Sequence, residues 1–214
     1  MSDHANALTD ELTDIQARIL GCLIEKEGTT PDQYPLSLNA LKNACNQKSN
    51  RFPVVNYYEG EIGQALRRMY DLRLVSEESG ARTPRYRHHA PEVLGVLKKE
   101  LAVLCVLMLR GPQTPGEIRG RCHRLFEFDD TDDVVYVLQR LMERDHPYVM
   151  QLPRQPGQKE ERYAQLLCGE PDLSDLPAPA PRRSTSSELE QRVEQLEEEV
   201  ARLKQVVQGW LDEE

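Results

Sequence analysis

The chain repeats one arrangement of predicted elements, and this repeat limits its fold more than any other feature. In each copy, three segments with apolar residues at helical spacing precede a strand, a glycine-containing turn and a second strand. Gly28 and Gly111, which follow the first helix of each copy, are 83 residues apart, and Tyr86 and Tyr163 in the last strands are 77 apart. Three helices followed by a hairpin is the order of a winged helix. A period of about 80 residues therefore predicts tandem winged-helix units.

The first unit is expected over 1–90. Thr13 and Gln16 form a capping-box pattern at the start of its first helix, and Gly28 is a natural end. The other elements are expected as follows: a second helix after Ser37, a third over 59–71, and strands over 73–78 and 85–89. Gly21 and Gly63 lie inside helical segments, where an isolated glycine indicates close packing.

The second unit is expected over 91–169. Its first helix, over 94–109, is apolar on more than one face, and such a helix is expected to be buried on several sides. A second helix starting at Thr114, a third over 130–144 and a hairpin within 148–167 complete the repeat. The predicted fold class is mainly α with short β-hairpins (α+β).

Charge is distributed unevenly along the chain. The net charge is -9, but residues 171–214 hold five basic and eleven acidic residues, whereas 42–89 hold nine basic and five acidic residues. The stretch that contains the third helix and hairpin of the first unit is therefore locally basic, a property expected of a surface that meets nucleic acid.

The first unit carries a candidate DNA interface in this basic stretch. We expect phosphate contacts from the loop before the third helix and from the hairpin turn, with base contacts from the third helix. The candidate residues are Lys48, Asn50, Arg51, Arg67, Arg68, Arg82, Arg85 and Arg87. His88 and His89 are expected on the surface or facing DNA. The alternative is a solvated surface whose arginines pair with Glu59, Glu61 and Asp71; carboxylates at 59 and 61 would also repel phosphate.

The second unit is a poorer candidate for DNA contact. Its third helix opens with five residues, 129–133, four of which are aspartates, and its turn offers only Arg154 and Lys159. Aspartates suit a helix N-terminus through the helix dipole, but they repel a DNA backbone. We expect this unit to build or brace the assembly.

Residues typical of catalysis or metal binding are not arranged for either role. The adjacent pair Cys122 and His123 lacks the spacing of zinc ligands, and no catalytic triad, phosphate loop or paired-carboxylate setting stands out. We expect no enzymatic activity, cofactor or metal. The chain has no apolar run long enough for a membrane span and no secretory signal, and its five scattered cysteines suit reduced thiols in a cytoplasmic protein.

The C-terminal part has a different character. Residues 170–187 are rich in proline and serine and are expected to form a linker, and 188–214 to form a helix. Apolar residues then alternate at spacings of four and three, with valine at a and leucine at d, which favours a parallel two-stranded coiled coil. The expected dimerisation residues are Leu189, Val193, Leu196, Val200, Leu203, Val207 and Trp210. The alternative is a single amphipathic helix that folds back onto the second unit.

Four separated motifs in order resemble the YceH-like family of uncharacterised bacterial proteins. They are LTDIQARILGCLIEKEGTTPDQYPLSLNALKNACNQKSNR, RYRHH, LRGPQTPGEIRGRC and LPRQPGQKEERYAQLL, and the resemblance spans about 13–168. It implies a tandem winged-helix fold in a bacterial cytoplasm, and it carries no catalytic residue and no settled function.

The sequence as a whole favours a non-enzymatic, homodimeric DNA-binding transcriptional regulator that contacts DNA through its first unit. The alternative is a protein-interaction module of tandem winged helices, acting as a scaffold or a chromosome-associated accessory subunit.

Overall fold

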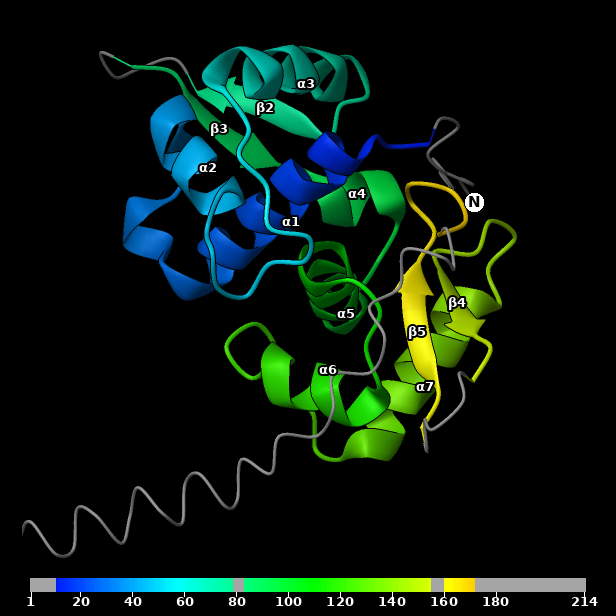
Figure 1. Ribbon diagram of the computed structural model, residues 1–214. Helices are drawn as coiled ribbons and strands as arrows, with labels where there is room; N and C mark the ends of the chain where they lie inside the picture. The colour runs from blue at the N-terminus through cyan, green and yellow to red at the C-terminus, as the bar shows by residue number, and fades with distance from the viewer. Residues whose placement is uncertain (1–10, 79–82, 155–159, 172–214) are drawn as a thin grey trace, which may run out of the picture. The chain divides into compact units, whose positions relative to one another are not determined.

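The computed structural model describes residues 11–78, 83–154 and 160–171, and it is α-rich with small antiparallel sheets (Figure 1). The first unit contains α1 (Asp14–Thr29), the 3-10 turn η1 (Pro31–Gln33), β1 (Leu36–Ser37), α2 (Leu38–Cys45), α3 (Glu59–Asp71), β2 (Val75–Glu78) and β3 (Arg85–His88). The second contains α4 (Ala90–Leu94), α5 (Lys98–Arg110), α6 (Pro115–Cys122), α7 (Thr131–Met142), β4 (Val149–Leu152) and β5 (Arg162–Gln165).

The expected succession of helices and an antiparallel hairpin occurs in both halves. In the first, β3 lies between β1 and β2, with Val75 opposite His88 and Leu36 opposite Tyr86. In the second, β4 pairs with β5. The sequence pattern missed β1, because a strand of two residues is too short to show alternation.

Several of these helices have side-chain hydrogen bonds at their first turn, at the positions that the sequence predicts. The Thr13 backbone N–H donates to Gln16 at 2.8 Å, and the Ala40 N–H donates to the Ser37 hydroxyl at 3.3 Å. The Thr114 hydroxyl accepts from the Glu117 N–H at 3.2 Å in the same way. Each cap satisfies a donor that the first turn of a helix leaves without a partner.

The helix expected over 94–109 begins later, as α5 at Lys98, and Leu94 is the last residue of the separate short helix α4. Gly95 ends α4 with a left-handed φ of 61°, a conformation that glycine adopts without steric cost. α5 then begins after Leu97, which is 55% exposed rather than buried. The expectation of burial on several sides is confirmed for α5 itself, since every residue from 100 to 109 is buried.

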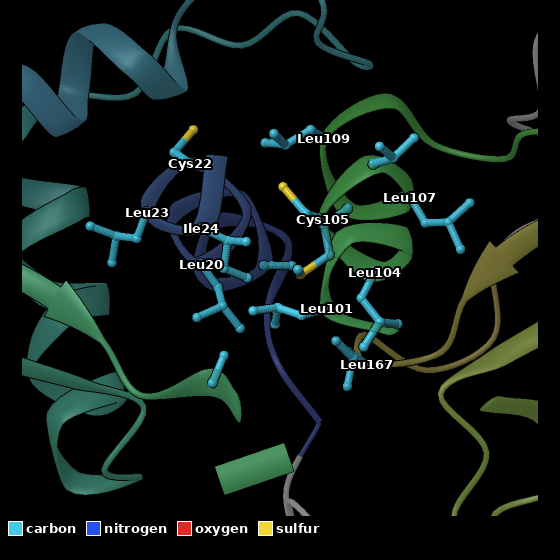
Figure 2. Close-up of a cluster of buried hydrophobic side chains, with 14 of the residues drawn as sticks. Leu20, Cys22, Leu23, Ile24, Leu101, Leu104, Cys105, Leu107, Leu109 and Leu167 are labelled. Atoms are coloured by element: carbon cyan, nitrogen blue, oxygen red, sulfur yellow. The ribbon is translucent and has the colours of Figure 1, made fainter. Parts of the chain in front are cut away.

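The two halves share one hydrophobic core, centred on the packing of α1 against α5. Figure 2 shows Leu20 and Ile24 of α1 in one cluster with Leu101 of α5. A Cβ added at Gly21 would lie 2.9 Å from the Leu109 side chain, so the close packing expected at this glycine is confirmed. The same expectation was wrong for Gly63, where an added Cβ would meet no atom within 4 Å.

Candidate nucleic-acid interface

α3 presents an exposed polar face at the surface of the first unit. Its apolar face is formed by residues 62, 65, 66 and 69, which are buried against the core. Arg67 and Arg68 are exposed. In the part of the chain that the structure describes, neither arginine lies within ion-pair distance of a carboxylate. Both guanidinium groups are therefore available to an anionic partner.

The acidic residues at the start of α3 have partners other than these arginines. Glu59 forms an ion pair with Lys42 of α2, with 2.7 Å between Nζ and Oε1. Glu61 accepts a hydrogen bond of 2.7 Å from the Tyr58 backbone N–H. Lys42 offsets the charge of Glu59, and the helix N-terminus is a favourable place for Glu61. The repulsion of phosphate expected from these two carboxylates is correspondingly weaker.

The hairpin adds two further arginines beside α3. Arg85 is exposed and donates to the Pro35 carbonyl at 2.7 Å. Arg87 pairs with Glu78 at 2.8 Å across β2 and β3, and both side chains stay nearly half exposed. Exposed pairs of this kind are weak, so Arg87 can exchange its partner for a phosphate. Arg82 of the candidate set lies outside the described residues.

The loop before α3 places Lys48 and Asn50 on the surface, as expected. Asn50 has a φ of 60°, which asparagine tolerates better than most residues. Asn46 fixes the far end of the loop, because its side chain both donates to the Tyr57 carbonyl and accepts from the Tyr57 N–H.

Arg51 does not belong to this surface, and its assignment as a DNA contact was wrong. Its side chain is fully buried, with Nη2 2.6 Å from Glu25 Oε2, and its Nε donates to the Ala44 carbonyl. Burial raises the pKa of Glu25, but hydrogen bonding and charge from Arg51, with a smaller contribution from Lys26, outweigh this effect and lower it. The neighbouring Arg18, also buried, donates to the Cys45 and Pro53 carbonyls. These two arginines attach the loop to α1.

Of the two histidines, His88 differs from expectation and His89 does not. His88 is buried rather than on the surface, with Nε2 3.0 Å from a Glu27 carboxylate oxygen, and its Nδ1 accepts from the Ala90 N–H. Burial lowers the pKa of His88. His89 is half-buried, and its Nε2 lies 2.7 Å from the Ser76 hydroxyl.

The sequence pattern missed Arg73, which lies between α3 and β2. It is exposed and has a φ of 58°, a conformation in which glycine is usual. Tyr58 and Tyr70 at the two ends of α3 are also largely exposed, at 71% and 61%. The absence of glycine after α3 is the one sequence signal that could have drawn attention to Arg73.

In the corresponding helix of the second unit, α7, most of the charged side chains already have partners. Asp130 caps the helix through the Asp133 N–H at 2.8 Å, and Asp133 also lies 3.7 Å from Lys99. Arg140 pairs with the buried Glu100 at 3.3 Å. An anionic partner would have to break these contacts within the unit, so α7 is a poorer candidate surface than α3.

Residues 12–158 match the family described as "Protein of unknown function, DUF480". The chain belongs to the DUF480 family. Three similar proteins are UPF0502 proteins. The one from Aeromonas hydrophila is 51% identical, and the match covers 92% of this chain and 93% of the relative. The one from Vibrio campbellii is 49% identical, with 89% of this chain and 90% of the relative covered, and the one from Koribacter versatilis is 50% identical, with 87% of each chain covered. The expected membership of an uncharacterised bacterial family is thereby confirmed, and these DUF480 relatives extend over most of the chain.

The described ranges of this DUF480 protein contain no group of three or more potential metal-binding side chains. None of the helices found there has the length and apolarity needed to cross a membrane. The five cysteines are free thiols, four of them buried.

Proposed function

We propose that this chain is a non-enzymatic DNA-binding protein, a transcriptional regulator whose two halves are winged helices. In the first, α3 is the recognition helix and β2–β3 is the wing. The succession of three helices and an antiparallel hairpin supports this assignment, because a winged helix places its third helix in the major groove and its hairpin over the adjacent backbone.

The proposal rests mainly on Arg67 and Arg68, which are exposed on the outer face of α3 and form no ion pair with any residue that the structure describes. Long cations on a protruding helix release counterions when they neutralise phosphates, which is the main source of DNA affinity. Lys48 on the preceding loop and Arg85 on the hairpin are further exposed basic residues of the first unit. The second unit supports α1 through α5 and is not assigned a DNA contact.

The proposal includes a homodimer formed by the C-terminal heptads. The seven apolar positions from Leu189 to Trp210 lie outside the described residues. The linker over 170–187 also lies outside them, except for residues 170 and 171. The heptad spacing alone supports pairing between two copies, which would present two first units to a two-fold DNA site.

Salt-dependent DNA binding tests the proposal. Fluorescence anisotropy with a random-sequence duplex should give binding at about 50 mM salt, with affinity falling steeply as salt rises. The double variant Arg67→Gln/Arg68→Gln should bind more weakly, and its log–log salt slope should fall by up to about 0.9 for each lost phosphate contact.

The matched control is Lys98→Gln/Arg154→Gln, which removes the same charge from exposed positions of the second unit. It should leave the slope unchanged. If the wild type does not bind in a salt-sensitive way, or if the two double variants lose affinity equally, the first unit is not the DNA interface.

A protein partner is the second candidate, favoured by the loop that precedes α3. Val54 and Tyr58 are 58% and 71% exposed, although the loop backbone is fixed by Arg18 and Asn46. Apolar side chains presented by a rigid loop are typical anchors for protein recognition. Under this candidate, Val54→Ser would abolish capture of the partner, whereas Arg67→Gln/Arg68→Gln would not change DNA affinity.

A further inference from the structure

A surface hollow of about 440 Å³ lies where α3 ends and β2 begins. Its walls come from the last turn of α3, the following turn, β2 and the end of β3, and the lining residues are Tyr70, Asp71, Arg73, Val75, Ser76 and His89. This volume lies in the range of sites that bind small molecules. The region can be located in Figure 1 at the junction of α3 with β2.

Arg73 occupies a backbone position that favours glycine. The Arg73 N–H donates to the Tyr70 carbonyl and the Leu74 N–H donates to the Met69 carbonyl, which together form a Schellman motif with Arg73 in the left-handed position. A non-glycine residue there costs about 1 kcal/mol. Strain of this kind is concentrated at functional positions, where a side chain is needed in spite of its cost.

The hollow contains opposite charges that do not neutralise each other. Asp71 and Arg73 both line it, and within the described ranges neither forms an ion pair. Ser76 and His89 are joined by a contact of 2.7 Å on one side. The ring of Tyr70, 61% exposed, adds a flat apolar surface.

We propose that this hollow binds a small zwitterion of the α-amino acid class. The ligand carboxylate meets the Arg73 guanidinium, and its ammonium group meets the Asp71 carboxylate. Both are charge-assisted hydrogen bonds, which are stronger than neutral ones. The ligand side chain lies against the exposed ring of Tyr70. The proposal stands on these residues alone and does not depend on DNA binding.

NMR titration of the full-length, ¹⁵N-labelled protein with the proteinogenic L-α-amino acids tests the proposal. At least one of them should shift amide signals of residues 70–76 and 89 at concentrations up to about 10 mM, in the affinity range of weak small-ligand sites. The N-acetyl and carboxamide derivatives of that amino acid each lack one charge. Each should bind at least about tenfold more weakly.

Two variants assign the roles of the charged residues. Arg73→Gly keeps the left-handed turn, so the protein stays folded while the guanidinium is lost. Asp71→Asn removes only the charge. Each should weaken binding by about tenfold or more, whereas the control Lys98→Gln should not change it. If no amino acid shifts these signals, or if either derivative or either variant binds as tightly as its parent, the proposal is overturned.

Discussion

Arg51 and Glu25 form an ion pair that attaches the loop before α3 to α1. The stability that this pair contributes can be measured by breaking it. Arg51→Met removes two hydrogen bonds to the Glu25 carboxylate and one to the Ala44 carbonyl, and it leaves Glu25 with the Lys26 ammonium at 3.4 Å. Breaking a buried pair in this way should lower the free energy of unfolding by about 3 kcal/mol. Urea denaturation should find a change below about 0.5 kcal/mol for the exposed Arg67→Met, since surface substitutions are nearly neutral. Equal effects of the two would contradict the burial of Arg51.

The Arg51–Glu25 pair also makes the free energy of unfolding depend on pH. The folded-state pKa of Glu25 is lowered, so its contribution is present above the ordinary carboxyl pKa of about 4.5 and is lost as the pH falls through the folded value. Arg51→Met removes the larger of the two effects that lower the pKa of Glu25, and the smaller one from Lys26 remains. The stability difference between wild type and variant should therefore be constant near neutral pH and shrink below about pH 4.5.

Gly21 and Gly63 lie in the middle of helices but should respond oppositely to alanine. Gly21→Ala places a methyl group 2.9 Å from Leu109 and should destabilise the protein by about 1–3 kcal/mol. Gly63→Ala points into open space and should stabilise it by about 0.5–1 kcal/mol through higher helix propensity. Thermal unfolding of both variants checks this pair, and a shift of the melting temperature in the same direction for both would rule out the packing described here.

At the scale of secondary-structure elements, α5 is the helix on which both halves depend. Leu104 is fully buried within it, so Leu104→Ala should cost about 2–5 kcal/mol. Leu97, at the exposed N-terminus of the same helix, provides the matched control, and its alanine variant should cost less than about 1 kcal/mol. Denaturant midpoints for the two variants provide the comparison, and an unchanged midpoint for Leu104→Ala would place that residue outside the core.

The helices and hairpins could be predicted from sequence because each buries one face, and that face leaves a period of 3.6 or 2 in the chain. The break at Gly95 was missed since apolar residues occur on both sides of it and conceal the left-handed turn. β1 was missed because two residues contain no period.

The candidate interface was predicted less completely, because net charge and spacing do not reveal burial. Lys48, Arg67 and Arg85 are exposed as expected, but Arg51 lies two residues from Pro53 in a loop that folds back onto α1. Only the tertiary structure brings Glu25 to it, 26 residues away along the chain. Arg73 was missed for a related reason, since its left-handed conformation is set by the turn after α3 and no sequence motif marks that turn.

At the scale of the whole molecule, self-association remains a prediction from the heptads. Sedimentation of the full-length protein should give a dimer, whereas a 1–170 truncation should give a monomer or a weaker dimer, because it lacks residues 188–214. The comparison should extend to about 100 µM, where weak dimers form by mass action. Equal masses for the two proteins over this range would exclude the coiled coil.

Hydrogen exchange of the full-length protein, with and without a saturating duplex, tests whether α3 and the hairpin of the first unit contact DNA. Backbone amides that become less accessible exchange more slowly. If α3 and the hairpin do contact DNA, exchange becomes slower over 59–71 and 85–88, and exchange over 131–142 of α7 is unchanged. Slower exchange in α7 alone, or no change in any segment when DNA is added, would contradict this contact.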